Sequence, residues 1–232
     1  MTHVERFAFV LIPGAGGEAW YWHLVAPMLQ AAGHDAVAVA LPAVDDRARL
    51  PEYAAAVVQA IGDRDPARIV LVAQSMAGFT APMVYERAGA ALLVLVNAMI
   101  PKPGETPGEW WKNTRHAEAK RTPFDPLEDL FHDVPPAVTD AAFARGEPRQ
   151  SEAIFQSPCA ISAWPAVPTR VLAGRDDRFF PIAFQRRVAR ERLRLGVDEM
   201  PGGHLVAFSQ PAELAARLIA YLPAVSVVQR GR

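Results

Sequence analysis

The chain has 232 residues, 51% of them hydrophobic, so it can bury a large core, and its length suits one α/β domain with an insertion better than two domains. Its 24 basic and 25 acidic residues give a net charge of −1 and form no charge run, which argues against nucleic acid or a membrane surface as a partner. The single cysteine, Cys159, excludes an internal disulfide, and no Cys/His spacing typical of a metal site occurs, so we expect neither metal nor cofactor.

The apolar run at residues 7–12 does not predict export. Arg6 precedes it and Pro13-Gly14 end it, which leaves it too short for the apolar region of a signal peptide. No other stretch approaches the roughly 18 apolar residues of a membrane span. We therefore expect a soluble, cytoplasmic protein, either a monomer or a homodimer.

Buried strands alternate with helices along most of the chain. Short apolar runs rich in β-forming residues predict strands, and runs with helical spacing that stop at a glycine or another end signal predict helices. The predicted strands are residues 7–12, 35–40, 68–73, 91–97, 169–173 and 197–200, and the predicted helices are 20–32, 51–61, 76–88, 182–192 and 211–222. This alternation predicts an α/β fold with a mostly parallel, doubly wound sheet covered on both faces.

Residues 98–166 break the alternation. They are rich in proline, tryptophan and charged residues and contain short helical fragments but no clear strand. We interpret them as a small helical cap inserted into one core that residues 1–97 and 167–222 form. Residues 223–232 are expected to be a frayed tail.

The turn at Ser75 is the first candidate for chemistry. It lies between the strand at 68–73 and the following helix, where a serine is held in a strained conformation that presents its hydroxyl above the sheet. Ala73 and Ala77, two residues before and after, are small enough for the crowded turn. The N–H of Met76, at the start of the helix, is available to an oxyanion. The alternative is that Ser75 only caps this helix.

A serine nucleophile needs a base and a carboxylate that orients the base. Of the six histidines, only His204 lies in a glycine-rich loop after a strand late in the chain. Asp176 and Asp177 follow the strand at 169–173, on the same expected edge of the sheet. We predict Asp177 as the acid, with Asp176 as the alternative, and a surface-loop histidine is the other interpretation of His204.

The loop after the first predicted strand, Pro13-Gly14-Ala15-Gly16-Gly17, lacks bulky side chains, so its backbone can approach a ligand. The N–H of Ala15 is our candidate for the second oxyanion donor. A glycine-rich loop can also bind phosphate, but this one lacks both the dinucleotide fingerprint and the lysine of a P-loop. Cys159 is a rival nucleophile only in principle, because Ser-Pro-Cys-Ala forms no recognisable turn and a buried inert thiol is the usual case.

Several segments of the sequence are distinctive. They are Phe9-Val-Leu-Ile-Pro-Gly-Ala15, Ala19-Trp-Tyr-Trp-His-Leu24 with Pro27, Ala32-Gly-His34, Asp177-Arg-Phe-Phe-Pro-Ile-Ala-Phe-Gln-Arg186, and Gly202-Gly-His204 with Pro211. Together they resemble the plant methylesterase and hydroxynitrile lyase group of α/β-hydrolases and its bacterial relatives. The resemblance covers most of the sheet-forming chain and little of the cap. It implies the α/β-hydrolase fold, a Ser75–Asp177–His204 triad, and Ala15 and Met76 as backbone donors.

Two positions in this resemblance bear on the reaction. The lyases of the group have threonine where Gly14 stands and lysine where Leu205 stands, and an apolar Leu205 cannot stabilise a leaving cyanide. Pro13 and Gln74 replace a usual histidine and a usual histidine or glutamate, which changes the polarity of the pocket. Epoxide hydrolases and haloalkane dehalogenases of this fold need an aspartate nucleophile, so Ser75 argues against both.

The predicted function is hydrolysis of a small-molecule carboxylic ester through an acyl-enzyme. We expect the pocket to include Gly14, Trp110, Phe131 and Leu205, because the cap is rich in aromatic residues, although these rings could instead pack the cap onto the sheet. Two other functions stay open. One is C–C cleavage like that of hydroxynitrile lyases, and the other is a non-catalytic small-molecule receptor of the same fold.

Overall fold

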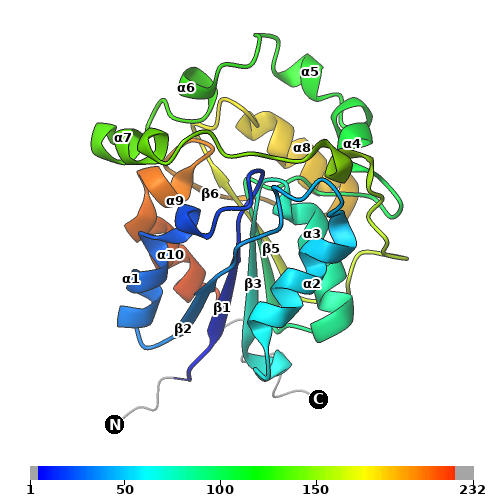
Figure 1. Ribbon diagram of the computed structural model, residues 1–232, viewed down its shortest axis with the longest axis vertical. Helices are drawn as coiled ribbons and strands as arrows, with labels where there is room; N and C mark the ends of the chain where they lie inside the picture. Colours follow the sequence, from blue (N-terminus) through cyan, green and yellow to red (C-terminus); the bar gives the residue numbers. More distant parts are fainter. Residues whose placement is uncertain (1–4, 223–232) are drawn as a thin grey trace.

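Six parallel strands form the central sheet of the computed structural model, which describes residues 5–222 (Figure 1). The strands are β1 (Ala8–Ile12), β2 (Asp35–Ala38), β3 (Ile69–Gln74), β4 (Leu92–Val96), β5 (Thr169–Gly174) and β6 (Asp198–Met200). Their order across the sheet is β2-β1-β3-β4-β5-β6, and every neighbouring pair is parallel. The predicted parallel, doubly wound sheet is thus confirmed.

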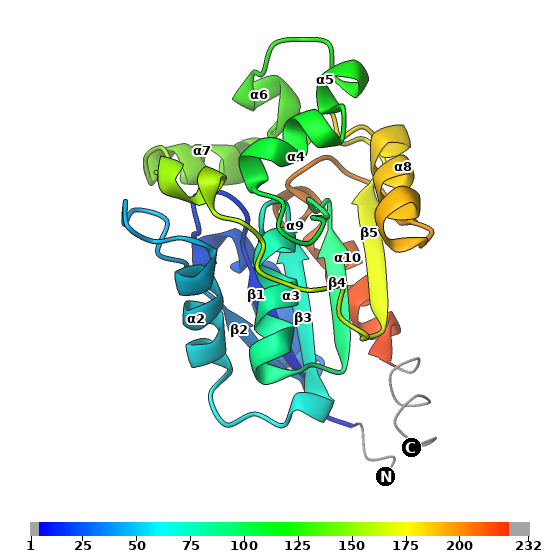
Figure 2. The same cartoon turned by 90° about the vertical axis from the view of Figure 1, so that its right-hand side faces the viewer.

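Helices cover both faces of this sheet because successive strand side chains point to opposite faces and are apolar on each. In β3, Leu71 and Ala73 belong to the core under one set of helices, and Val70 and Val72 to the core under the other. The first set is α2 (Leu50–Ile61), α3 (Ala77–Ala88) and α8 (Ile182–Leu193), and the second is α1 (Val25–Ala31), α9 (Val206–Ser209) and α10 (Pro211–Ala220) (Figures 1 and 2).

The helix predicted at 20–32 is two elements, the 3₁₀ helix η1 (Ala19–Trp22) and α1. Pro27 explains the break. A proline is tolerated in the first turn of a helix but its ring clashes with the carbonyl four residues earlier, here that of His23, so the α-helix begins only at Val25. The 3₁₀ helix η2 (Pro66–Arg68) leads into β3.

Between β4 and β5 the described chain has no strand, and its helices lie above the carboxyl ends of the strands (Figure 2). They are α4 (Pro107–Asn113), α5 (His116–Ala119), α6 (Pro126–Asp129), α7 (Pro136–Ala144) and the 3₁₀ helix η3 (Glu152–Gln156). We call this segment the cap. The predicted tail at 223–232 lies outside the described residues. Within residues 5–222, no helix combines the length and apolar character that crossing a membrane requires.

Candidate active site

The strand order places a crevice at the carboxyl ends of β1 and β3. These strands are neighbours, but the chain continues from β1 to β2 on one side and from β3 to β4 on the other. In parallel α/β sheets, ligands bind where the strand order reverses in this way. The glycine-rich loop at 13–17 leaves β1 at this point, and the turn at Ser75 leaves β3.

Ser75 has a φ of 51°, in the left-handed region that side chains other than glycine rarely adopt. Three hydrogen bonds hold this conformation. The N–H of Ser75 donates to the carbonyl of Val96 (3.1 Å), and its carbonyl accepts from Gly78 (3.1 Å) and Met99 (2.9 Å). A Cβ at Gly78 would lie 1.9 Å from the carbonyl oxygen of Met99. The turn therefore needs glycine at 78 as well as small residues at 73 and 77.

The imidazole of His204 lies between Ser75 and Asp177. Its Nε2 is 3.1 Å from Oγ of Ser75, and its Nδ1 is 2.9 Å from Oδ2 of Asp177. All three residues are at least nine-tenths buried. The neighbouring Asp176 instead accepts a hydrogen bond from the N–H of Gly202 (3.1 Å). Of the two adjacent acids, the structure therefore brings Asp177 to the histidine.

Backbone N–H groups from Asp177's own loop hold its carboxylate. Oδ1 accepts from Phe179 (2.9 Å) and Phe180 (2.7 Å), which leaves Oδ2 for the histidine. The rings of these two phenylalanines stand edge-on to the imidazole of His204, with centroids 5.1 and 4.9 Å away. On the outer side of this wall, Nε2 of His116, from α5 in the cap, lies 2.7 Å from the carbonyl of Phe179, and burial lowers the pKa of His116. Asp177 and His204 are each less than 5% exposed.

The loop after β1 leaves one N–H uncommitted. Gly14 and Gly16 donate to two glutamine side chains, and Gly17 donates to the carbonyl of Gly14 (3.1 Å). Within residues 5–222 the N–H of Ala15 has no acceptor, and neither does that of Met76 at the start of α3. Two free donors beside a buried serine suit a single oxyanion. A phosphate cradle would need several free N–H groups in one loop.

Asn97 is a site residue that the sequence analysis did not single out. It follows β4, is fully buried and has a φ of 44°. Its Nδ2 donates to the carbonyls of Gly203 (2.9 Å) and His204 (3.0 Å), and its Oδ1 accepts from the N–H of Gly174 (2.8 Å). Asn97 therefore ties the loop that carries the histidine to the end of β5, three residues before Asp177. The only signal in the sequence is a polar residue that ends an apolar strand.

Two other missed residues support the same two loops. Nε2 of Gln185, on α8, donates to Oδ2 of Asp177 (3.2 Å) and to the carbonyl of Phe180 (2.8 Å). Oδ2 of Asp133, in the cap, accepts from the N–H of Gly203 (2.6 Å), next to His204. Asp133 lies 70 residues from Gly203, so no local pattern predicts that contact. Gln185 is only eight residues from Asp177, but nothing in the sequence marks it as a partner of the carboxylate.

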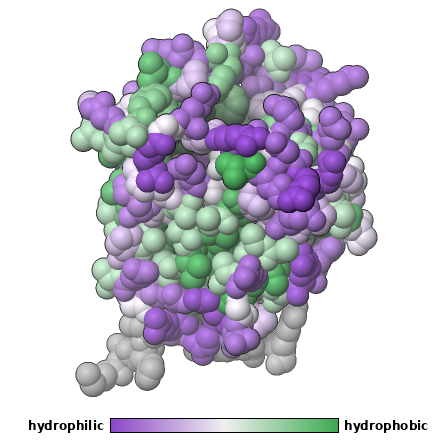
Figure 3. Space-filling model, viewed as in Figure 1, coloured by the Kyte–Doolittle hydropathy of each residue, from purple (hydrophilic) through white to green (hydrophobic). Residues whose placement is uncertain are grey.

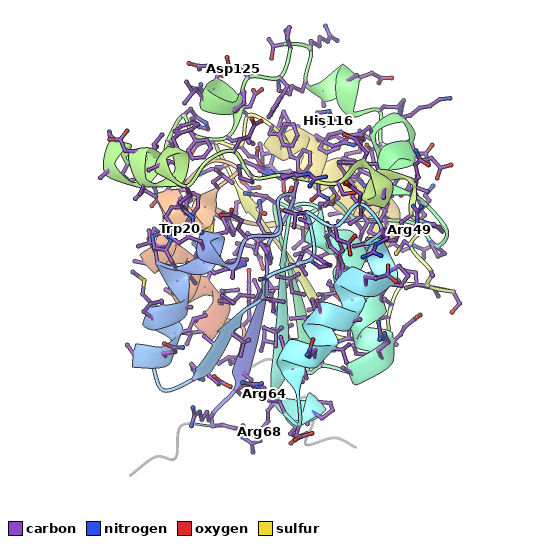
Figure 4. All side chains as sticks on the ribbon, viewed as in Figure 1. Trp20, Arg49, Arg64, Arg68, His116 and Asp125 are labelled. Atoms are coloured by element: carbon purple, nitrogen blue, oxygen red, sulfur yellow. The ribbon has the colours of Figure 1, made fainter. Side chains whose placement is uncertain are left out.

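A cavity of about 640 Å³ lies between the loop after β1 and the cap. Of the predicted pocket residues, Gly14, Phe131 and Leu205 line it, as does Ala15. Its other aromatic walls are Trp20, Tyr21, Phe124, Phe143 and Phe208. Trp20, in η1, lies below α7 (Figure 4). Hydrophobic residues gather on the surface over α6 and α7 (Figure 3). An apolar, aromatic cavity of this size suits a small organic molecule.

Trp110, which we predicted to line the pocket, is not among the residues that line this cavity. The side chain is fully buried, and its Nε1 donates to the carbonyl of Ile100 (3.0 Å). Its ring packs against Phe180 and Phe184, with centroids 5.4 and 5.6 Å away. Trp110 therefore anchors α4 of the cap to the core, which is the packing role left open in the sequence analysis.

The thiol of the lone cysteine is buried and unreactive. Cys159 is fully buried, its Sγ lies 3.6 Å from the carbonyl of Phe79, and burial raises its pKa to about 12. A thiol of this kind is not ionised at neutral pH. Among residues 5–222, no group of three or more His, Cys, Asp or Glu side chains could hold a metal ion.

The parallel sheet, the strained serine between β3 and α3, and the order Ser75, Asp177, His204 along the chain together define an α/β-hydrolase architecture. The sequence model of the Alpha/beta hydrolase family matches residues 9–217, and the protein belongs to this family. This finding confirms the resemblance on which the sequence analysis relied.

Among curated proteins, the chain is similar to the probable esterase PIR7A of Oryza sativa, with 33% identity over 110 residues that cover 43% of this chain and 42% of the relative. It is also similar to Methylesterase 3 of Arabidopsis thaliana, with 30% identity over 127 residues that cover 50% and 48%. The chain thus matches just under half the length of these relatives.

Two solved structures have the same fold. The crystal structure of polyneuridine aldehyde esterase superposes with a TM-score of 0.77 at 20% identity, covering 93% of this chain and 99% of the other. That of a pyrethroid hydrolase from Sphingobium faniae JZ-2 superposes with a TM-score of 0.74 at 21% identity, covering 95% and 98%.

Proposed function

We propose that this protein is a serine hydrolase that cleaves a small carboxylic ester, with Ser75 as nucleophile, His204 as base and Asp177 as the acid that orients the base. The observation that carries the proposal is the unbroken line of hydrogen bonds from Asp177 to His204 (2.9 Å) and from His204 to Ser75 (3.1 Å). The names of the relatives, an esterase and a methylesterase, support ester hydrolysis.

The reaction has two steps with the same chemistry. Nε2 of His204 takes the proton of Ser75 as Oγ attacks the ester carbonyl carbon, and the N–H groups of Ala15 and Met76 bind the resulting oxyanion. His204 then protonates the leaving alkoxide, which departs as an alcohol and leaves an acyl-serine. A water molecule repeats the sequence and releases the carboxylic acid. Asp177 keeps the imidazole oriented and stabilises its protonated form.

The cavity favours esters with an apolar or aromatic portion. Its walls are mostly apolar and include six aromatic side chains, and the side-chain amide of Gln150, which also lines it, is already engaged in hydrogen bonds on both its oxygen and its nitrogen. An apolar acyl or aryl group therefore gains burial there without breaking the hydrogen bonds of the Gln150 amide.

Two residues favour hydrolysis over cyanohydrin cleavage. Leu205 offers no charge to a leaving cyanide, and it lines the cavity directly after His204. At Gly14, a Cβ would lie 2.4 Å from Oε1 of Gln74 and 2.8 Å from Cβ of Ser75. The loop therefore has no room for the threonine that the lyases carry at this position.

A fluorophosphonate probe, followed by peptide mapping, tests the proposal. We expect stoichiometric labelling of Ser75 in the folded protein, no labelling of a Ser75→Ala variant, and turnover of at least one member of a panel of small methyl, aryl and thio-esters. Labelling of Ser75 without turnover of any ester, but with release of cyanide from mandelonitrile, would favour the lyase. An unlabelled Ser75 in folded protein would favour a receptor that binds without catalysis.

A further inference from the structure

Two glutamine side chains hold the loop after β1, one on each side of Ala15. Gln74, the last residue of β3, accepts from the N–H of Gly14 with its Oε1 (3.1 Å). Gln150, which precedes η3 in the cap, accepts from the N–H of Gly16 with its Oε1 (3.0 Å). The N–H between them, that of Ala15, is the uncommitted one.

The loop needs such support because its own sequence does not determine its shape. Gly16 and Gly17 have φ values of 84° and 64°, which few other residues adopt, and a glycine-rich segment has many alternative conformations of similar energy. Each N–H that is bound to a side chain removes part of this freedom. The direction of the Ala15 N–H therefore depends on the acceptors that hold Gly14 and Gly16.

The cap is in close contact with this loop. A Cβ at Gly16 would lie 2.6 Å from Cβ of Pro148, so the backbone of the loop and the cap segment are in direct contact. The N–H of Ser151, in the same segment, donates to the carbonyl of Ala43 in the core (2.8 Å). The cap chain around Gln150 is thus seated on the core on both sides of the glutamine.

The amide of Gln150 is itself held in place. Its Nε2 donates to the hydroxyl of Tyr53 (2.9 Å), which projects from α2 and is almost fully buried, and to the carbonyl of Ser151 (3.2 Å). These two acceptors determine which end of the amide faces Gly16, so Oε1 is the atom presented to the loop. A side chain that only lined a cavity would not need partners on both ends.

We propose that Gln150 is a positioning residue for the oxyanion hole, so that the cap completes the catalytic machinery as well as covering the cavity. This inference rests on the proposed hydrolase function. Loss of the Gly16 contact lets the loop rotate and turns the Ala15 N–H away from the oxyanion. The effect falls on the transition state, because the ground-state ester carbonyl makes weaker use of this donor.

The test compares wild-type protein with Gln150→Met, which keeps the length of the side chain but has no amide oxygen. We expect kcat for an activated aryl ester to fall about 10- to 50-fold, below the roughly 100- to 1,000-fold of a deleted oxyanion donor, with KM changed by less than about threefold. The rate of inactivation by the fluorophosphonate should fall in parallel, because its phosphoryl oxygen occupies the same hole. Hydrogen exchange at the Gly16 amide, measured by NMR, should become faster.

The matched control is Arg149→Ala, which removes the neighbouring exposed side chain and its ion pair with Asp46. It should leave kcat and Gly16 exchange unchanged. A Gln150→Met protein with wild-type kcat, or one with raised KM and unchanged kcat, would overturn the inference, and so would unchanged Gly16 exchange. If Gln150→Met does not fold, Gln150→Ala, which removes side-chain bulk as well, is judged by the same criteria. Failure of the proposed function has a different result, namely no probe labelling and no ester turnover in the wild type.

Discussion

The side-chain amide of Asn97 donates to the carbonyl oxygen of His204 at 3.0 Å, so a residue outside the proposed triad holds the backbone of its base. The same amide group satisfies the carbonyl of Gly203 and, through its oxygen, the N–H of Gly174. All of these backbone groups are buried, and a buried polar group without a partner costs about 1–3 kcal/mol.

Asn97→Ala should therefore lower both stability and activity. We expect a loss of about 3 kcal/mol in the free energy of unfolding, since several buried polar groups lose a partner together, and a fall of at least tenfold in kcat because the backbone that carries the imidazole is no longer held. Urea unfolding and ester kinetics measure the two effects. Wild-type kcat in the folded variant would show that the histidine loop keeps its shape without Asn97.

Removal of the side chain of either Ser75 or His204, between which the proton moves, should abolish turnover without loss of structure. For Ser75→Ala and His204→Ala we expect kcat to fall on the order of a million-fold, and the double variant to be about as inactive as either single one, because the two residues act as a unit. Circular dichroism serves as the folding control. Additive effects of the two substitutions would contradict a joint role.

Gly14→Ala should inactivate the enzyme through crowding at Ser75. The added Cβ would meet Oε1 of Gln74 and Cβ of Ser75 at 2.4 and 2.8 Å, so the loop must shift and the Gly14–Gln74 hydrogen bond with it. We expect kcat/KM for an aryl ester to fall at least 100-fold, by analogy with the loss of one oxyanion donor. Gly196→Ala is the matched control, because a Cβ there meets no atom within 4 Å. Equal activity in the two variants would exclude steric control at Gly14.

Glu105 should make the protein sensitive to acid. Burial alone would raise the pKa of Glu105, but hydrogen bonds from Arg192, Asn113 and the N–H of Lys102 outweigh it and hold the pKa below its usual value. A carboxyl whose pKa is lowered by folding stabilises the native state fully above its unfolded pKa, and this contribution is lost as the pH falls through the folded pKa.

Glu105→Gln leaves Arg192 buried without a charged partner, which should cost about 3–5 kcal/mol at pH 7. The difference in unfolding free energy between wild type and variant should shrink as the pH is lowered below about 4.5, where the unfolded carboxyl takes up its proton. Chemical denaturation across this range provides the measurement. A difference that stays constant with pH would assign the effect of the substitution to packing rather than to the charge.

The sequence predicted the elements of the site that depend on local patterns. Ser75, Asp177 and His204 each follow a strand, and because the strands are parallel, their carboxyl ends meet at one edge. Asn97 and Gln150 could not be predicted in the same way. Their partners lie 107 and 134 residues away in sequence, and only the assembled sheet and cap bring them together. The cap has no regular periodicity, so its aromatic residues carried no signal that separates pocket from packing.

Trp110 and Phe131 test this distinction directly, since both were predicted to line the pocket and only Phe131 does. Trp110→Ala removes a fully buried ring and should cost about 3–5 kcal/mol of stability, with KM for an aryl ester little changed.

Phe131→Ala should have the opposite effect, a raised KM with little loss of stability. Its ring is only half-buried and faces the cavity near Phe143 and Phe208. We expect KM to rise about five- to tenfold, because the substrate loses part of one apolar contact, and stability to change little. Denaturation curves and ester kinetics on the two variants, side by side, give the comparison. A raised KM in Trp110→Ala at wild-type stability would place its ring in the substrate's path, contrary to the packing observed here.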